Sequence, residues 1–535
     1  MKNARKSTII LVAAIVLIAS AIGVLNNYRK KEARFGPYDR PLVGAPETAN
    51  PLAGIAEDFS VGDSFSSHLP LVIIDTGGVR PPISTLLDLF EDIRYPIPGV
   101  EAVVNGSVSI INTGGVNRLT DAPETVVPVD IKRRGHSSMS YPKAQYLIKT
   151  VTESGQEFDT PILGMGADSE WVLNGAMVDK SLMRNYLSLC VASKFLPFTP
   201  DSVYCEVLYH ENGQYYYEGV YLMIESIKQG PDRVDIPDSK DSGPFTSYIV
   251  RRDRYDSEAN TLYTWATERG LTERYLTLRY PGRLSATEQN ISFVTQDISQ
   301  IEQVLYSDDF SVFSTYSRYI DVDSFVDYLI FNEFFGSYDA GLHSTYMYKP
   351  IGGKLSVGPV WDLDNATDNY QLEPLDVDVT AFQTKPWFDR LMSDANFLSK
   401  VEARYAELRR GPLSDETVTG LIDDIALHLG PAIDREWHRW NDSGAFSDSS
   451  TGYSFALQDY EDDYGDLMVR DTSEYRYEVY RLKTAIALHA HAIGPRLQTL
   501  QQSTDVRTGV SAYSWLILVA VLLVFALPSI YVSRK

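Results

Sequence analysis

The sequence is poor in the residues that build zinc sites and disulfide frameworks. Its 535 residues include only 2 cysteines, Cys190 and Cys205, and 8 histidines. There is no cluster of cysteines and no H-E-x-x-H pattern, which argues against a zinc site. The two cysteines could pair in an oxidising compartment or remain buried thiols, and the sequence leaves both alternatives open.

Positive charge is also scarce. The chain has 48 Lys and Arg against 71 Asp and Glu, a formal net charge of −23 at pH 7. Because a phosphate backbone requires a basic face, this balance predicts no nucleic-acid partner. The run Arg435–Trp440 mixes basic and aromatic residues. In so acidic a chain it indicates the packed face of a helix.

Two long apolar runs stand near the ends of the chain. Residues 8–27 and 513–532 approach the length of about 20 residues that spans a bilayer. The first run follows a short basic tail, 1–7, and contains Ala19–Ala21, a possible cleavage site, so it is either an anchor or a signal peptide. Because short basic tails resist translocation, we expect a membrane protein with the bulk of the chain outside the cytoplasm.

The interior of the chain divides into a linker and two lobes. Residues 28–66 lack periodicity, 67–230 contain mainly strand patterns, and 231–500 contain mainly helical ones. Asn212-Gly213, between two alternating runs, predicts a hairpin. Asp179 is a candidate N-cap for a helix over 179–194. Further helices are expected at Ile291–Leu305, Val322–Phe335, Pro386–Arg410, Ser414–Trp440 and Tyr475–His489.

These patterns predict an α+β fold with the two-lobed plan of protein kinases. The expected N-lobe is an antiparallel sheet, the expected C-lobe is mainly helical, and the two lobes lie between two terminal transmembrane helices. The usual kinase motifs are absent: there is no G-x-G-x-x-G loop, no H-R-D-L and no D-F-G.

Three carboxylates carry the most informative pattern. Asp339 precedes Asp362 and Asp364 by about two dozen residues, and the latter two follow a short apolar strand pattern. Hard oxygen ligands of this kind suit Mg²⁺, which usually binds together with phosphates. In phosphoryl-transfer sites one carboxylate orients the acceptor hydroxyl while another holds the metal ion.

Several blocks of sequence resemble the CotH family of spore-coat kinases. The run Arg133–Lys149 is similar to the family's R-G-x-S-S-x-x-x-P-K-x-x-Y-x-x-K signature. The resemblance continues, in order, at Asp179–Asn185, Gly219–Ile227, Ile320–Tyr328, Ser344–Lys349 and Gly358–Asp362. It implies an atypical kinase that binds ATP and Mg²⁺ (or Mn²⁺) and phosphorylates proteins.

The resemblance also implies roles for individual residues. Asp339 matches the catalytic-loop aspartate, Asp362 matches the metal-binding aspartate, and Asp364 could add a second oxygen. Lys149 matches the lysine that contacts phosphates, with Lys143 as the competing position. Two further positions are weaker candidates for the nucleotide side of the site: Glu225, which could instead pair with a lysine, and Arg184, which could instead lie on a helix surface.

One position departs from the kinase pattern. Five residues after the catalytic aspartate a kinase carries a metal-binding asparagine, whereas this chain carries Ser344. Two functions therefore remain open. The first is a membrane-anchored kinase that transfers the ATP γ-phosphate to Ser or Thr of an envelope or coat protein. The second is a catalytically inactive scaffold for surface or coat assembly.

Overall fold

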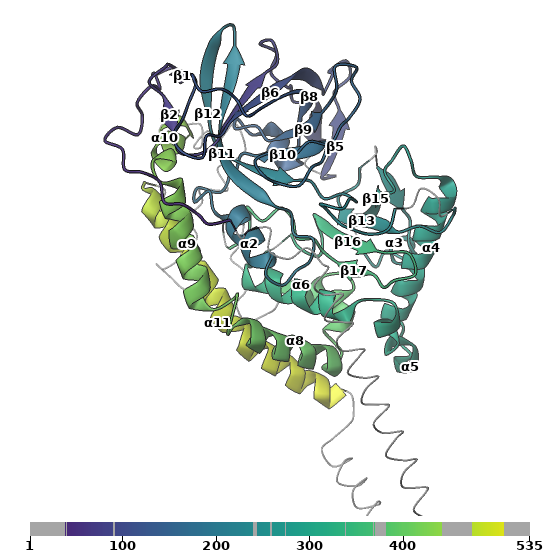
Figure 1. Cartoon of the computed structure of the whole chain (residues 1–535). Helices are drawn as coiled ribbons and strands as arrows, with labels where there is room; N and C mark the ends of the chain where they lie inside the picture. The colour runs from purple at the N-terminus through teal and green to yellow at the C-terminus, as the bar shows by residue number, and fades with distance from the viewer. Residues whose placement is uncertain are drawn as a thin grey trace, which may run out of the picture.

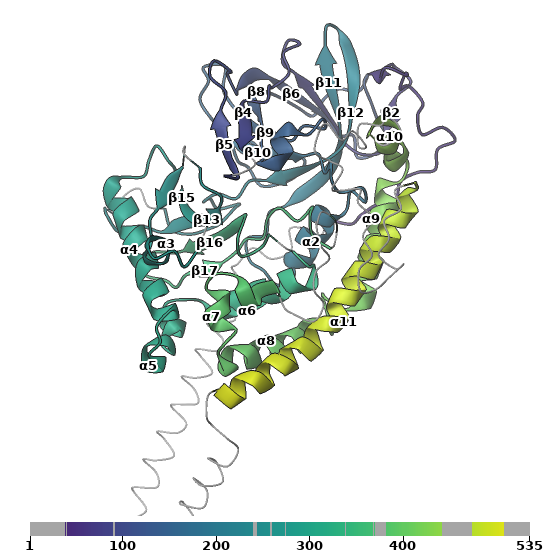
Figure 2. The same ribbon diagram turned by 180° about the vertical axis from the view of Figure 1, so that it is seen from behind.

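The computed structural model describes residues 38, 40–88, 91–238, 243–256, 259–272, 274–337, 339–367, 369, 381–440 and 473–507. Figure 1 shows two lobes, each built on a sheet, with long helices along one flank, and Figure 2 shows the same arrangement from behind. We call the part around the larger sheet the first lobe and the part around the smaller sheet the second lobe.

The larger sheet closes on itself. Its strand order ends at the eleventh strand, which also pairs with the twelfth strand at the other side of the sheet. All pairings are antiparallel except that of the third and eleventh strands. The strands are β1 (Ser60–Val61), β3 (Leu71–Asp75), β6 (Val104–Ile111), β8 (Thr125–Arg133), β9 (Tyr146–Thr150), β10 (Glu170–Asn174), β11 (Ser202–Glu211) and β12 (Gln214–Glu225).

Alternation of side chains explains the enclosed core of this sheet. Successive residues of a strand point to opposite faces, so every second residue enters the space that the closed sheet surrounds. The interior is filled by pairs such as Val72 and Ile74 of β3, or Trp171 and Leu173 of β10. The hairpin between β11 and β12 turns at Asn212 and Gly213, both with positive φ, as its sequence predicts.

Two small pairings border the first lobe. Strands β2 (Ser66–Ser67) and β7 (Asn117–Arg118) form one, and strands β4 (Thr85–Asp88) and β5 (Ile93–Pro96) form the other. A short 3-10 helix, η1 (Ser137–Ser140), follows β8.

The helix expected at 179–194 is shorter than predicted. It is α2 (Arg184–Ala192), and Asp179 lies before it as a side chain that accepts hydrogen bonds from the backbone of Ser181 and Arg184. All nine residues of α2 are buried. Apolar residues of α2, of the outer face of the large sheet and of the second lobe belong to one hydrophobic core. The two lobes therefore share a core.

The second lobe contains a sheet that the sequence patterns missed. Its strands are β13 (Tyr248–Asp253), β14 (Asn260–Leu262), β15 (Tyr275–Tyr280), β16 (Thr345–Lys349) and β17 (Ser356–Val357), in the order β14-β15-β13-β16-β17. The helices around it are α3 (Trp265–Glu268), α4 (Glu288–Leu305), α5 (Phe310–Phe313), α6 (Val322–Phe334) and α7 (Phe388–Leu391), with the 3-10 helices η2 (Tyr316–Arg318) and η3 (Ala381–Thr384).

The remaining helices connect the lobes along one flank. They are α8 (Ala395–Leu408), α9 (Asp415–Leu429), α10 (Pro431–Trp440) and α11 (Tyr475–Arg507). In Figure 1, α11 runs from the base of the second lobe up toward the first lobe, with α8 beside its lower part and α9 beside its upper part, and α10 lies near β12. Ser414 caps α9 by accepting a hydrogen bond from the backbone of Thr417.

The expected fold class needs correction. The mixed α+β architecture is present, but the second lobe holds a five-stranded sheet and is not simply helical. The placement between two transmembrane helices is wrong for the described part of the chain, where no helix is both long and apolar enough to cross a membrane. The two runs predicted to span, 8–27 and 513–532, lie outside the described residues.

Both cysteines are buried thiols that form no disulfide. Cys190 lies on α2 and Cys205 on β11, so they belong to different elements of the first lobe. The thiol alternative is therefore the one that the structure contains.

Candidate functional site

A cleft of about 2100 Å³ lies between the two lobes. From the first lobe it is lined by the segment after β8 and by β9 and β10, and from the second lobe by β13 and by the segments 339–344 and 361–365. Four of the residues predicted from sequence line it together: Lys149, Asp339, Asp362 and Asp364. Residues that are almost two hundred positions apart in sequence thus face one space.

Asp339 follows the C-terminus of α6 in a tight turn. Its backbone carbonyl accepts hydrogen bonds from the N–H groups of Leu342 and His343, at 3.0 and 2.8 Å. Its side-chain Oδ2 accepts a hydrogen bond of 2.6 Å from Nδ2 of Asn365. The turn fixes the backbone and Asn365 fixes the carboxylate, so the Asp339 side chain is oriented toward the segment that carries the other two acids.

Asp362 and Asp364 lie in the segment that follows β17. Ser344 donates a hydrogen bond of 3.2 Å to Oδ2 of Asp362. Both residues have positive φ, 47° for Ser344 and 64° for Asp362. Non-glycine residues adopt this region rarely and at a cost of about 1–3 kcal/mol, and such residues cluster at functional sites.

The electrostatics of these two acids are unfavourable without a cation. Burial raises the pKa of Asp362, and Asp339 adds to this, while Arg134 opposes it. Burial raises the pKa of Asp364 strongly, and the neighbouring charges of Asp362 and Asp179 raise it further. A shift of this direction means that the ionised forms are destabilised by their surroundings.

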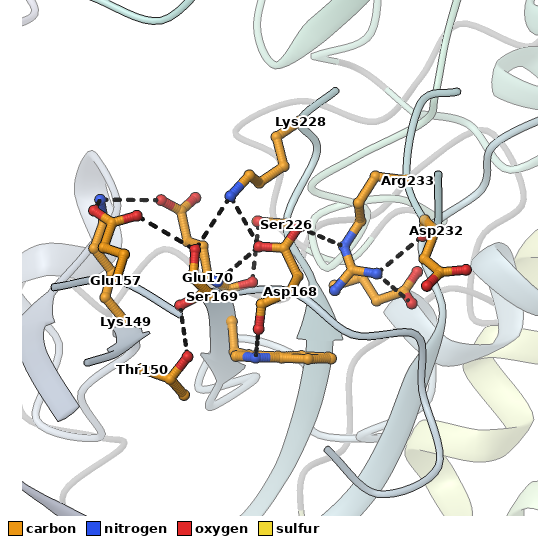
Figure 3. Close-up of polar contacts among 12 residues, drawn as sticks. Lys149, Thr150, Glu157, Asp168, Ser169, Glu170, Ser226, Lys228, Asp232 and Arg233 are labelled. Carbon is orange, nitrogen blue, oxygen red and sulfur yellow. Dashed lines mark hydrogen bonds and ion pairs between the residues drawn. The ribbon is translucent and has the colours of Figure 1, made fainter. Parts of the chain in front are cut away.

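Lys149 points from β9 into the same cleft. Its Nζ lies 2.5 Å from Oε1 of Glu157 and 3.8 Å from Oε2 of Glu170, the residue directly opposite it on β10. Figure 3 shows Lys149 between these acids. Burial lowers the pKa of Lys149, but the hydrogen bond to Glu157 and the charge of Glu170 outweigh it, so the net pKa is raised. The lysine stays charged, and its acidic partners come from the first lobe itself.

Arg184 lies outside the cleft lining and contacts the backbone of the segment that carries Asp362 and Asp364. Its guanidinium pairs with Asp179 at 2.6 Å and donates to the backbone carbonyl of Ala366 at 3.0 Å. The adjacent Asn185 accepts a hydrogen bond of 2.9 Å from the backbone of Leu363. The N-terminus of α2 therefore holds the backbone on both sides of Asp364.

Lys143 and Glu225 are buried at other places. Lys143 donates hydrogen bonds to Glu436 of α10 at 2.5 Å and to the carbonyl of Val220 at 2.7 Å. Glu225 accepts from Arg233 at 2.8 Å, and the same carboxylate accepts from the backbone of Asp201 at 2.9 Å. Neither side chain lines the cleft, so of the two lysines it is Lys149 that joins the acids.

Comparison with known families assigns the chain. The model of the CotH kinase protein family matches residues 131–481. The chain belongs to the CotH kinase family. The matched segment includes cleft residues from both lobes, among them Lys149, Asp339 and Asp362. A comparison with curated proteins finds no match.

Two cations of this CotH-family cleft were not singled out from the sequence. Arg134 lines the cleft and lowers the pKa of both Asp362 and Asp364, against the effect of burial. It stands in the R-G-x-S-S part of the family signature, which was the available signal. Lys385 also lines the cleft and is only 4% exposed. Burial lowers its pKa, and the charge of Asp339 opposes that change.

Nothing in the sequence pointed to Lys385. It is an isolated lysine before a proline, far beyond the recognisable motifs. Its side chain reaches the site because it packs beside Gly341, where an added Cβ would lie only 2.9 Å from the Lys385 Cβ. The glycine leaves the room that the lysine occupies.

The cleft fits a divalent cation that brings other ligands with it. No group of three or more His, Cys, Asp or Glu in the described ranges is arranged to hold a metal ion alone. Mg²⁺ commonly takes one or two carboxylates and completes its shell with phosphates and water. Asp362 and Asp364 supply such carboxylates, and because burial raises the pKa of both, a bound cation would stabilise their ionised forms.

Proposed function

We propose that this CotH-family chain is a protein kinase. It would transfer the γ-phosphate of ATP, with Mg²⁺ or Mn²⁺, to a Ser or Thr hydroxyl of an envelope or coat protein. The observation that carries the proposal is the convergence of Asp339, Asp362, Asp364 and Lys149 on one cleft between the lobes. These residue types are those that orient an acceptor, hold a metal ion and contact phosphates.

The charge of the cleft supports a phosphate-bearing substrate. The whole chain has a net charge of −23, yet basic side chains outnumber acidic ones in the cleft lining. Clefts lined by one sign of charge raise the local concentration of ligands of the opposite sign. The basic lining residues are Arg94, Lys132, Arg133, Arg134, Lys149, Arg251, Arg254, Arg279, Arg283 and Lys385.

The size of the cleft supports two substrates. Ligand pockets commonly enclose about 300–1,000 Å³. The cleft, at about 2100 Å³, exceeds that range and leaves room for a nucleotide and for a segment of an acceptor protein beside it. This is the arrangement that direct transfer between two bound molecules requires.

The inner wall of the first lobe suits a nucleotide base. The apolar side chains of Leu147, Val172 and Ile227 line the cleft from β9, β10 and the segment after β12. Neither the N–H nor the C=O of Ile227 has a hydrogen-bond partner in the described part of the chain, although the residue is only 9% exposed. Buried backbone groups are normally paired, so the N–H and C=O of Ile227 at the cleft wall suit hydrogen bonds to the edge of a nucleotide base.

The proposed chemistry divides the labour between the acids. Asp339 would accept the proton of the acceptor hydroxyl. The hydroxyl oxygen would form a bond to the γ-phosphorus of ATP, and the bond between that phosphorus and the bridging oxygen would break, which releases ADP. Asn365 keeps the Asp339 carboxylate in place. Lys149 and Arg134 would hold phosphate oxygens from the first lobe. A bound Mg²⁺ or Mn²⁺ at Asp362 would offset the phosphate charge.

A second candidate is a catalytically silent member of the family that acts as a scaffold. The observation in its favour is Ser344, which stands where a kinase carries an amide and donates its hydroxyl to Asp362. A hydroxyl that occupies an oxygen of Asp362 competes with a metal ion for it.

Phosphate transfer distinguishes the two candidates. The purified full-length chain is incubated with γ-labelled ATP and Mg²⁺ or Mn²⁺, with dephosphorylated casein as acceptor, beside Asp362→Asn. If the chain is a kinase, the wild type should label casein and the variant should not. Equal labelling by both proteins would reject the kinase hypothesis, and nucleotide binding without transfer would favour the scaffold hypothesis.

A further inference from the structure

The position after Asp364 carries an amide that the sequence motifs do not use. Ser344 lacks the amide oxygen that a kinase places at this point, and its hydroxyl is engaged with Asp362 at 3.2 Å. Asn365, which directly follows Asp364, lines the same cleft. An amide is therefore present in the site, although it reaches the site from a different part of the chain.

The orientation of the Asn365 side chain follows from its partner. An ionised carboxylate only accepts hydrogen bonds, so the atom 2.6 Å from Oδ2 of Asp339 must be the Nδ2 donor. The amide oxygen Oδ1 is then directed away from this contact. That oxygen is buried and has no hydrogen-bond partner in the described part of the chain.

A buried amide oxygen without a donor is uncommon and needs a partner. The neighbouring carboxylates of Asp362 and Asp364 cannot supply a donor when ionised. A divalent cation would be a partner for each of these oxygens, because Mg²⁺ and Mn²⁺ take carboxylate and amide oxygens as ligands. An amide ligand would also be consistent with the absence, among the described residues, of three or more His, Cys, Asp or Glu side chains arranged to hold a metal ion.

We infer that Asn365 supplies an amide oxygen to the divalent cation of the cleft through Oδ1, while its Nδ2 holds Asp339. In this arrangement Asn365 takes the place of the amide that is missing at Ser344. The side-chain amide of Asn365 would then hold both the cation that binds the phosphates and the Asp339 carboxylate that orients the acceptor. The inference rests on the proposed function and names a further residue of the same site.

The test measures metal binding directly rather than activity. The full-length protein with ADP is titrated with Mn²⁺ and free Mn²⁺ is followed by electron paramagnetic resonance. We expect Asn365→Ala to weaken Mn²⁺ binding by about 10- to 100-fold. Asn365→Asp, which keeps an oxygen at that place, should bind Mn²⁺ within about threefold of the wild type and yet lose phosphate transfer, because the donor to Asp339 is gone.

Asn105→Ala is the matched control. Asn105 also donates a 2.6 Å hydrogen bond to an aspartate, Asp130, but on the exposed face of β6 and outside the cleft lining. It should bind Mn²⁺ as the wild type does. Thermal unfolding without metal, at similar temperatures for all variants, shows that they fold.

Two results would overturn the inference. Wild-type Mn²⁺ affinity in Asn365→Ala together with lost transfer would mean that Asn365 only positions Asp339. Weakened Mn²⁺ binding in Asn365→Asp would mean that an oxygen at this place is not what the ion needs. Failure of the proposed function looks different, since the wild type itself would then transfer no phosphate, while the Mn²⁺ affinities of the variants would still test the role of Asn365.

Discussion

Buried charges occur at two places around the first lobe, and they are treated in opposite ways. Where α10 packs on the sheet, Lys143 pairs with Glu436 at 2.5 Å, and Arg435 grips Glu206 by two hydrogen bonds of 2.7 Å. In the cleft, no Lys or Arg nitrogen of the described residues lies within 4.0 Å of the carboxylate oxygens of Asp339, Asp362 or Asp364. One region satisfies its charges and the other does not.

The difference separates structural from functional charge. A buried ion pair with all its hydrogen bonds made holds two elements together, here α10 and the first lobe. Buried acids whose pKa values are raised by desolvation and by one another store unfavourable energy, which a ligand of opposite charge can release. Lys143 and Lys149, only six positions apart in the family signature, lie in different regions: Lys143 pairs with α10, and Lys149 lines the cleft.

The largest effect is expected from removing the acceptor-facing acid. Asp339→Ala should lower phosphate transfer by about 10²–10⁴-fold, because it removes the group that takes the hydroxyl proton. Nucleotide binding, measured by calorimetry, should stay close to that of the wild type. Transfer at the wild-type rate would remove Asp339 from the mechanism.

Breaking the paired region should cost stability and leave chemistry alone. Glu436→Gln leaves the Lys143 ammonium buried without its counter-charge, which should lower the free energy of unfolding by about 3–5 kcal/mol. Urea denaturation measures the loss. The double variant Lys143→Met with Glu436→Met is the control and should lose much less, since no unpaired charge remains. Equal losses in both would show that the charge pairing is not what matters there.

Glu333, an acid outside the cleft, tests whether a raised pKa makes the stability of the protein depend on pH. Burial raises the pKa of Glu333, on α6, to about 7, against the effects of the Phe382 N–H and of Arg496. Because the folded pKa lies above the unfolded one, the unfolded state loses its proton first as pH rises, and stability falls between about pH 4.5 and 7. The loss should be roughly 3 kcal/mol, since the folded and unfolded pKa values differ by about 2.5. Glu333→Gln should flatten this dependence in denaturation curves taken across that range; an unchanged curve would contradict the assignment.

Lys149 and Lys228, which both pair with acids near the start of β10, can be compared directly. Lys149→Met should raise the KM for ATP by about tenfold, the equivalent of roughly 1.4 kcal/mol, since it removes a contact to phosphate. Lys228→Met is a close control: the side chains are 34% and 35% exposed, both pair with acids, and Lys228 lies outside the cleft lining (Figure 3). Steady-state kinetics of both variants should show the change in Lys149→Met alone.

The smallest effect is a gain. Asp364→Asn removes a buried charge that its neighbours disfavour, so the metal-free protein should become more stable by about 1 kcal/mol at neutral pH. The same change should weaken Mn²⁺ binding. Differential scanning calorimetry without and with metal measures both, and a less stable metal-free variant would mean that the Asp364 charge is already compensated.

Local signals in the sequence were sufficient for several elements. Asn212-Gly213 turned the β11–β12 hairpin, and the apolar periodicity of α4 and α6 placed both helices within a few residues of their observed bounds. Helix 386–410 is in fact two helices, α7 and α8, and the segment 414–440 divides into α9 and α10 at Gly430. Such breaks depend on single residues, which a periodic pattern passes over.

Most strands of the second lobe were missed because they are very short or depend on partners far away in the sequence. β14 and β17 have only 3 and 2 residues, and β13 gains its place by pairing with β15 and β16 from distant parts of the chain. A strand of this kind is stabilised by its neighbours rather than by its own sequence. The same holds for the closure of the large sheet, which depends on the parallel pairing of β3 with β11.

The sequence alone determined the family, the hairpin, the main helices and the three acids, because each of these depends on residues close together or on a recognisable motif. Tertiary structure decided which lysine of that motif faces the acids, since Lys143 is claimed by Glu436, which lies 293 positions away. It also brought Asn365 to Asp339 and Lys385 to the cleft. Contacts over such separations form only when the core that both lobes share is packed, and no local pattern records them.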